Sequence, residues 1–150
     1  MRDTDLIAKK LTESVIGAFY EVYNNLGYGF LEHVHAKGLE RELRTRGHKV
    51  ARETNVRVLY KGKHLCTQRI DMLVDDTLII EIKSSETLPA PAMSQLRNYL
   101  KATNVEVGLL LHFGPKPRFY RQVMSNSPSL SKPDSSDLQR SFDSTRITRI

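Results

Sequence analysis

Two apolar, strand-like runs separated by three polar residues constrain the fold of this chain more than any other feature. The stretch from Gln68 to Lys83 predicts two β-strands joined by a turn at Asp75-Asp76-Thr77. Three residues inside these runs carry charges that an apolar core does not hold without a partner: Asp71, Glu81 and Lys83. Because side chains alternate along a strand, Glu81 and Lys83 point the same way, and a hairpin would bring Asp71 beside them.

This grouping of two acids and a lysine predicts a metal site with a cation next to it. Hard divalent ions such as Mg²⁺ bind carboxylate oxygens, commonly one or two from the protein, and complete their shell with water and phosphate. The lysine would activate a water or stabilise a developing negative charge. A second interpretation stays open, in which Asp71 and Lys83 form a buried ion pair and Glu81 is solvated at its strand end.

The length and charge of the chain limit the classes of protein to which it can belong. Its 150 residues suffice for one domain with a substantial core. A net charge of +6 favours a polyanionic partner, nucleic acid before an anionic membrane surface, although a basic chain can also simply be soluble. A single cysteine, Cys66, excludes an internal disulfide and a thiolate zinc cage, and we expect it to be a small core residue.

The sequence favours a cytoplasmic location. No run of about 18 apolar residues is present to span a bilayer, and the first residues contain no apolar segment before a cleavage site. The single cysteine fits a reducing compartment.

Apolar spacing predicts an alternation of helices and strands along the chain. Helices are expected at 5–25, 30–46 and 92–102, and strands at 50–60, 64–74, 78–83, 105–113 and 118–124. Glycines at 27 and 47 should end the first two helices, and Lys61-Gly62-Lys63 should form a hairpin turn. Because Leu78-Ile79-Ile80 is continuously apolar, its strand should be central and covered on both faces.

This order predicts an α/β domain over residues 1–124. Residues 125–150 are rich in Ser, Pro, Asp and Arg and poor in apolar residues. Such a segment cannot bury enough surface to offset its ordering entropy, so we expect a disordered tail.

Several other polar residues allow two interpretations on sequence alone. Glu32 could be a buried ligand or a first-turn acid that the helix dipole favours. His35 could approach a metal, but we expect a packed or surface histidine. Four basic residues could line a phosphate path or merely solvate the sheet edge: Arg57, Lys61, Lys63 and Arg69.

The ordered motifs resemble those of the PD-(D/E)XK nuclease superfamily. Asp71 followed ten residues later by Glu81-Ile82-Lys83 matches its acid and acid-x-lysine pair, and Gln95 with Tyr99 resembles the Gln-x-x-x-Tyr helix of the RecB-like branch. Over residues 5–124 the chain is similar to the small bacterial and archaeal GxxExxY proteins. Their naming motif falls on Gly29-x-x-Glu32-x-x-His35, with histidine in place of tyrosine.

The resemblance implies a restriction-endonuclease-like core, a mixed central β-sheet flanked by helices. It implies a nuclease that hydrolyses phosphodiester bonds of DNA with one or two Mg²⁺ or Mn²⁺ ions, held by Glu32, Asp71 and Glu81. Lys83 would position or deprotonate the attacking water, Gln95 would orient Lys83 or that water, and Tyr99 would support the phosphate or its helix. A homodimer would supply two sites for cutting two strands. The alternative is a nuclease-like module that binds nucleic acid, or a partner nuclease, without cutting.

Overall fold

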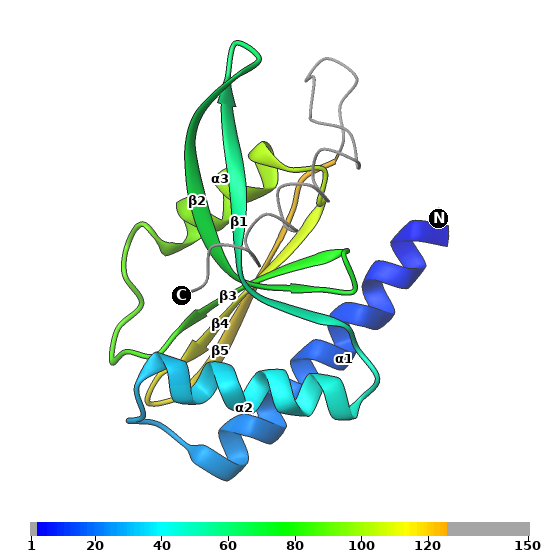
Figure 1. The fold of residues 1–150 in the computed structure, drawn as a ribbon. Coiled ribbons are helices and arrows are strands. Elements are labelled where there is room, and N and C mark those ends of the chain that lie inside the picture. The colour runs from blue at the N-terminus through cyan, green and yellow to red at the C-terminus, as the bar shows by residue number, and fades with distance from the viewer. Residues whose placement is uncertain (1–2, 126–150) are drawn as a thin grey trace.

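A mixed β-sheet lies between two groups of helices in the computed structural model, which describes residues 3–125 (Figure 1). The elements follow the chain as α1 (Asp3–Leu26), α2 (Glu32–Thr45), β1 (Val50–Tyr60), β2 (Lys63–Val74), β3 (Leu78–Lys83), α3 (Ala92–Ala102), β4 (Val107–Phe113) and β5 (Pro117–Val123). The strands keep this order across the sheet, and every neighbouring pair is antiparallel except β3 and β4. A parallel pair needs a crossover, which α3 supplies. The predicted α/β class is confirmed.

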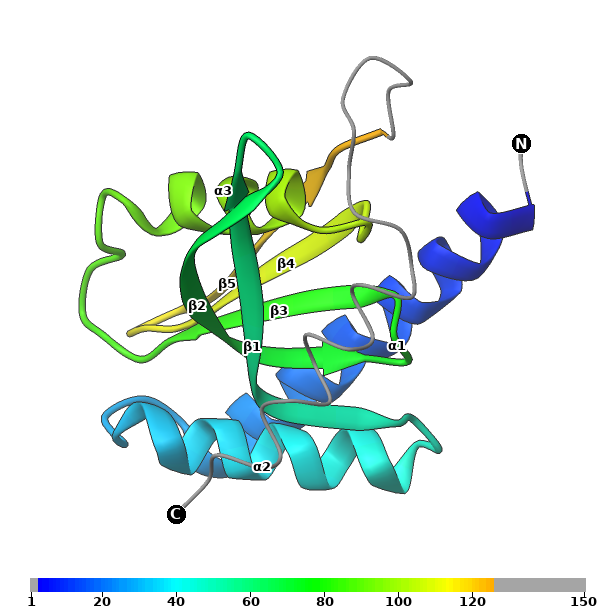
Figure 2. The ribbon, with the colours of Figure 1, turned by 45° about the horizontal axis from the view of Figure 1, so that its top comes forward.

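The helices cover both faces of the sheet and divide the core into two clusters. Figure 2 shows α1 and α2 on one face of the sheet and α3 on the other. In the first cluster, Phe19 and Leu39 pack with Ile80, and in the second, Leu96 packs with Ile79. Because alternate residues of β3 enter different clusters, this strand is covered on both faces, as its continuous apolar run predicts.

The first two helices end at glycines, as predicted. Gly27 and Gly47 follow α1 and α2 with φ of 73° and 88°, a left-handed conformation that glycine adopts without strain. The start of α2 differs from the prediction of residue 30. Leu31 has an extended backbone (φ −64°, ψ 153°) and is 71% exposed, so the helix begins at Glu32. This boundary places the Glu32 carboxylate in the first helical turn.

The β1–β2 hairpin is longer than the part of the sheet that supports it. Pairing of β2 with β3 is confined to residues 72–74, so the rest of the hairpin leaves the sheet and projects from the molecule (Figure 1). Its turn, Lys61-Gly62, lies between the paired residues Tyr60 and Lys63, as predicted. Cys66 is exposed on this projecting part. The expectation of a core cysteine was wrong because residues 61–69, which include Cys66, are all exposed in this part of the hairpin.

A chain of hydrogen bonds fixes the β2–β3 turn to α1 and to the loop between α2 and β1. Asp75 Oδ2 lies 2.7 Å from Nδ1 of His48, whose Nε2 lies 2.7 Å from Oγ of Ser14 in α1. Asp75 Oδ1 also accepts the backbone N–H of Lys49 at 2.8 Å. These contacts hold the hairpin that carries Asp71 and Glu81 in a fixed place on the helical layer.

Other strand ends differ from the prediction by one or two residues. The fourth strand begins at Val107, where it starts to pair with Leu78 of β3, rather than at 105. Such differences are usual for boundaries read from sequence. The predicted tail lies outside the described residues from 126 onward. No helix within residues 3–125 combines the length and the apolar character that crossing a membrane requires.

We expect a methyl group at Gly108 of β4 to push α3 away from the sheet. A Cβ there would lie 2.7 Å from Cδ1 of Leu96, which is fully buried. Gly108→Ala should therefore lower the free energy of unfolding by about 1–3 kcal/mol, measured by urea denaturation. Combined with Leu96→Ala, the two losses should be less than additive, since the smaller side chain makes room for the methyl group. A Gly108→Ala protein as stable as the wild type would contradict this packing.

Candidate functional site

Two buried acids face each other at the point where β2 and β3 separate. The last backbone pair of the two strands is Met72 with Ile80, so Asp71 and Glu81 come next. Oε1 of Glu81 accepts the backbone N–H of Asp71 at 3.1 Å, and Oδ2 of Asp71 accepts the backbone N–H of Ile82 at 2.7 Å. Each carboxylate thus satisfies an amide of the opposite strand where the regular ladder stops.

Burial makes ionisation of these two acids unfavourable. Glu81 is only 4% exposed, and this burial, with the neighbouring Asp71 as the second cause, raises its pKa to about 8. The pKa of Asp71 is also raised, again by burial first, while the hydrogen bond from Ile82 and the charge of Lys83 oppose the rise. Two carboxylates this close cannot both ionise easily without a cation nearby.

Glu32 and Lys83 join the same electrostatic neighbourhood. Partial desolvation raises the pKa of Glu32, the charge of Asp71 raises it further, and Lys83 with a hydrogen bond from the Ser84 backbone lowers it. The side chain of Glu32 nevertheless keeps contact with solvent. Glu32 is therefore both a first-turn acid of α2 and a neighbour of the strand acids, so the two interpretations of the sequence are compatible.

The alternative of a buried Asp71–Lys83 ion pair does not describe this structure. Within the described residues, no nitrogen of Lys83 lies within the 4.0 Å that defines an ion pair with a carboxylate oxygen. Glu81, which that alternative placed in solvent, is buried. Lys83 is half-buried and acts on the acids through its charge at longer range.

The two predicted residues of α3 have different positions. Tyr99 is 4% exposed, and its hydroxyl donates to the backbone oxygen of Arg69 at 3.4 Å. Burial first, and then the charges of Glu81 and Asp71, raise its pKa to about 12. Gln95, one turn earlier, is exposed, and no hydrogen bond between residues 3 and 125 joins its side chain to the charged group. The structure thus brings Tyr99 to the acids and leaves Gln95 at the solvent edge.

His35 is a buried connector between the site and the surrounding loops. It is fully buried, its Nδ1 lies 2.6 Å from Oγ of Ser84, and its Nε2 lies 2.8 Å from the backbone oxygen of Gly27. Its ring stacks on Phe113 with centroids 4.1 Å apart. Burial lowers the pKa of His35, so the ring is held neutral, donating from Nε2 and accepting at Nδ1. The expectation of a packed histidine is confirmed.

Two residues near the acids were missed by sequence reasoning. Ser84 links His35 to Glu32, and its position directly after Lys83 is the one signal that could have drawn attention to it. Arg52 lowers the pKa of Asp71, although its side chain is only 14% exposed and its Nε has no hydrogen-bond partner. Nothing in the spacing of β1 marks Arg52, because its closeness to Asp71 depends on the register between two strands.

The donor chemistry of this group fits a hard divalent cation. Three carboxylates from three elements repel one another, and oxygen ligands of this kind suit Mg²⁺ and Mn²⁺. The described part of the chain nevertheless contains no group of three His, Cys, Asp or Glu side chains close enough together to hold an ion. The amide hydrogen bonds of Asp71 and Glu81 each occupy one carboxylate oxygen. The predicted ligand set stays a prediction.

Comparisons with known proteins identify a family for this chain. A family model described as PD-(D/E)XK nuclease superfamily matches residues 9–123. Comparison with curated protein sequences gave no significant match.

Two solved structures are similar to this chain at low identity. The crystal structure of SSO0001 is 19% identical, with 78% of this chain and 58% of that chain covered and a TM-score of 0.47. The crystal structure of an alkaline exonuclease, LHK-Exo from Laribacter hongkongensis, is 16% identical, with 77% and 63% covered and a TM-score of 0.44. The chain spans less than two thirds of the length of either protein.

We expect the buried Glu81 to make the protein less stable as the pH rises toward 8 in buffer containing EDTA. The pKa of Glu81 is about 8 in the folded protein and 4.5 for the free group. Between these pH values the folded state therefore binds one proton more than the unfolded state. The free energy of unfolding should then fall by up to about 1.4 kcal/mol per pH unit in this window. Urea denaturation between pH 7 and 8 measures this slope above the range in which His35 titrates.

Glu81→Gln provides the test, because the amide stays neutral at every pH. Between pH 7 and 8, the free energy of unfolding of this variant should fall less steeply with pH than that of the wild type, because the contribution of Glu81 is gone. Equal slopes would show that Glu81 is already ionised at pH 7. Glu86→Gln, at an exposed position in the loop after β3, controls for the loss of one carboxylate.

We expect His35→Phe to lower the free energy of unfolding by about 1–3 kcal/mol. Phenylalanine keeps a ring that can stack on Phe113 but leaves the oxygens of Ser84 and Gly27 without their partner. His33→Phe, at an exposed position of the same helix, is the matched control and should have little effect. Equal chemical denaturation curves for the two variants would show that the hydrogen bonds of His35 contribute nothing.

Proposed function

Because the chain belongs to the PD-(D/E)XK nuclease superfamily, we propose that it is a nuclease that hydrolyses phosphodiester bonds of DNA with Mg²⁺ or Mn²⁺. The observation that carries the proposal is the electrostatic grouping of Glu32, Asp71 and Glu81 with Lys83. These charges are costly to bury, and a chain that needed only a stable fold could place apolar residues there. The net charge of +6 supports a polyanionic substrate.

In this proposal, one or two divalent ions are held by the carboxylates of Glu32, Asp71 and Glu81. Such ions lower the pKa of a water and neutralise charge on the scissile phosphate. They would also relieve the repulsion among the three acids, so the raised pKa values in the metal-free protein are what a cation site would have.

The remaining residues would position the reactants. The half-buried Lys83 lies beside the acids. Its ammonium would orient the attacking water, or, once deprotonated to the amine, Lys83 would accept a proton from that water. The Tyr99 hydroxyl, kept neutral by its raised pKa, would donate to a phosphate oxygen or support its helix. Gln95 would orient Lys83 or the water, which requires its exposed side chain to turn toward the acids when substrate binds.

The position of His35 bears on the finer family assignment. We propose that the chain is a GxxExxY protein, with Gly29-x-x-Glu32-x-x-His35 as the naming motif. In this chain the last motif residue forms hydrogen bonds to the residue after Lys83 and to the glycine that ends α1. That role holds the Glu32 turn and the end of β3 together, and a ring with a polar atom can fill it.

A non-catalytic binding module is the second candidate. The observation in its favour is that no three ligand side chains in the described part of the chain converge on one point. Such a module would bind nucleic acid, or a partner nuclease, without needing a divalent ion, and its binding to nucleic acid would weaken with salt.

We expect Asp71→Asn to abolish binding of Mn²⁺ and Mg²⁺ measured by isothermal titration calorimetry. The substitution removes the charge of the central proposed ligand while keeping its shape. Metal-dependent cleavage of a mixed DNA substrate should fall by about a hundredfold or more, because the ions supply several kcal/mol of transition-state stabilisation. Asp76→Asn is the matched control at the exposed β2–β3 turn, and it should behave as the wild type.

An Asp71→Asn protein that cuts DNA as fast as the wild type would overturn the catalytic assignment. If the wild type does not bind metal alone, the titration is repeated with a non-cleavable duplex, which can complete the ion shell with phosphate oxygens. Metal binding under that condition would support the nuclease. Tight nucleic-acid binding that is unchanged by EDTA, without cleavage, would favour the binding module.

A further inference from the structure

The outer part of the β1–β2 hairpin, residues 57–69, forms a basic arm that begins just beyond the buried Val56. Its sequence contains four Lys or Arg residues and no Asp or Glu: Arg57, Lys61, Lys63 and Arg69. All four are exposed, and so is every residue from 61 to 69. In the described part of the chain, the arm pairs with no strand outside the hairpin, because β2 meets β3 only over residues 72–74.

The strand register places the two arginines of the arm on one face. Arg69 is directly opposite Asn55, and Arg57 is two residues after Asn55, so the side chains of Arg57 and Arg69 share a face of the hairpin. Arg69 is also two residues before Asp71 and near enough to lower the pKa of that acid. The charged face of the arm therefore continues into the acidic site along β2.

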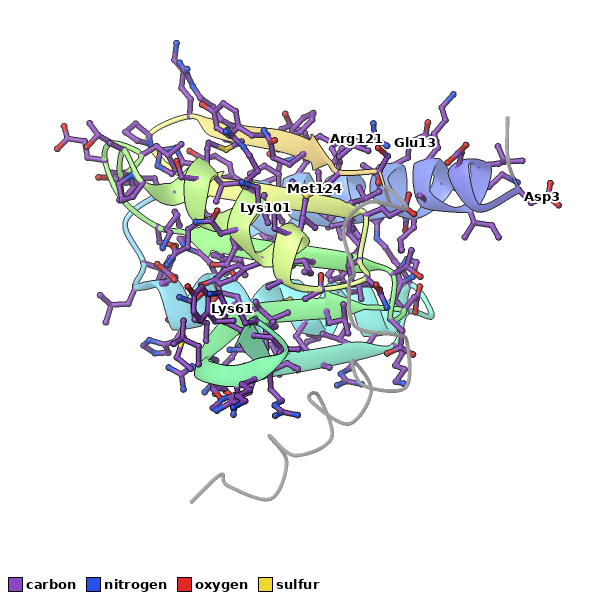
Figure 3. All side chains as sticks on the ribbon, turned by 90° about the horizontal axis from the view of Figure 1, so that it is seen from above. Asp3, Glu13, Lys61, Lys101, Arg121 and Met124 are labelled. Atoms are coloured by element: carbon purple, nitrogen blue, oxygen red, sulfur yellow. The ribbon has the colours of Figure 1, made fainter. Side chains whose placement is uncertain are left out.

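The tip of the arm uses a residue that its backbone does not favour. Lys61 and Gly62 both have positive φ, 51° and 78°, between the paired residues Tyr60 and Lys63. Two-residue turns of this kind strongly prefer Asn-Gly, and a lysine there strains the backbone. Lys61 Nζ lies 5.5 Å from the centre of the Tyr60 ring, which is itself 60% exposed. Figure 3 looks down on this tip, with Lys61 labelled. A cation and an aromatic ring are thus presented to solvent at the cost of turn stability.

We propose that this arm enters the major groove of duplex DNA and holds the duplex against the acidic site. The inference rests on the proposed function, because it names the form of nucleic acid that the site would receive. The major groove of B-DNA, about 12 Å wide and 8.5 Å deep, admits a two-stranded β-ribbon. From Arg57 to Tyr60 the arm extends for about 10 Å at the rise of a β-strand, which is enough to reach the groove floor. The major groove of duplex RNA is too narrow for such a ribbon.

The charge of the arm defines a measurable salt dependence. Each phosphate that a lysine or arginine neutralises adds about 0.9 to the slope of log affinity against log salt concentration for B-DNA. Removing two such contacts should lower the magnitude of the slope by about 2. Single strands have no groove, and the major groove of duplex RNA is too narrow for the ribbon, so the same removal should change their binding less.

The test measures binding to a fluorescent 20-base-pair DNA duplex by anisotropy, in EDTA, at several salt concentrations. The variant combines Lys61→Asn with Lys63→Gln, because asparagine suits the turn and should leave the hairpin folded. The control combines Lys9→Gln with Lys10→Gln, which removes the same charge from exposed positions of α1. We expect the arm variant to bind about tenfold more weakly with a slope smaller by about 2, and the control to resemble the wild type.

Three results would overturn the proposal. The first is an equal loss of DNA affinity in the arm variant and in the control. The second is an equal loss of affinity of the arm variant for duplex DNA and for single strands or duplex RNA. The third is an arm variant that changes in self-association and not in DNA affinity. Because binding is measured without a divalent ion, the outcome does not depend on catalysis. If the arm binds duplex DNA but the protein does not cleave it, the proposed role of the arm is supported and the proposed nuclease activity is not. If the protein cleaves DNA but the arm variant binds it as tightly as the wild type, only the proposed role of the arm is wrong.

Discussion

The reciprocal hydrogen bonds between Asp71 and Glu81 are the constraint on which the rest of the site depends. Where β2 leaves β3, the backbone amides of Asp71 and Ile82 have no partner in the regular ladder. The two carboxylates accept these amides across the gap at 3.1 and 2.7 Å. A buried acid can therefore stabilise the strand divergence and also present its second oxygen to the site. The divergence in turn frees the outer part of β2 to form the projecting arm.

The acids are supported from the helical side by a buried polar path. His35 contacts the backbone of Gly27 and the hydroxyl of Ser84, and the amide of Ser84 contacts Glu32. Because each polar atom in this path has a partner, the buried histidine stabilises the site where an unpaired one would destabilise it. A divalent ion would have to compete with the amide bonds of the strand acids.

Much of the fold was predictable because local rules and tertiary packing agree. Gly27 and Gly47 end helices through their freedom at positive φ, and the apolar run Leu78-Ile79-Ile80 favoured a central strand, which the structure shows. Cys66 was placed wrongly because cysteine is usually buried, and nothing in the local sequence shows that the hairpin extends beyond the layer that covers it. The closeness of Arg52 to Asp71 was also beyond sequence reasoning, because it depends on register between strands and not on spacing.

One predicted site residue, Asp71, lies on the same strand as Arg69 of the basic arm, and this couples the geometry of the arm to that of the site. Arg69 and Asp71 are two residues apart on β2, so a slip of the β1–β2 register by one residue would turn both to the opposite face. The pairing of Val74 with Leu78 and the anchoring of Asp75 by His48 fix the inner end of this register. The tight Lys61-Gly62 turn fixes the outer end. A groove held by the arm would therefore present its backbone at a set distance from the acids, so the position of cleavage would follow from the length of β2.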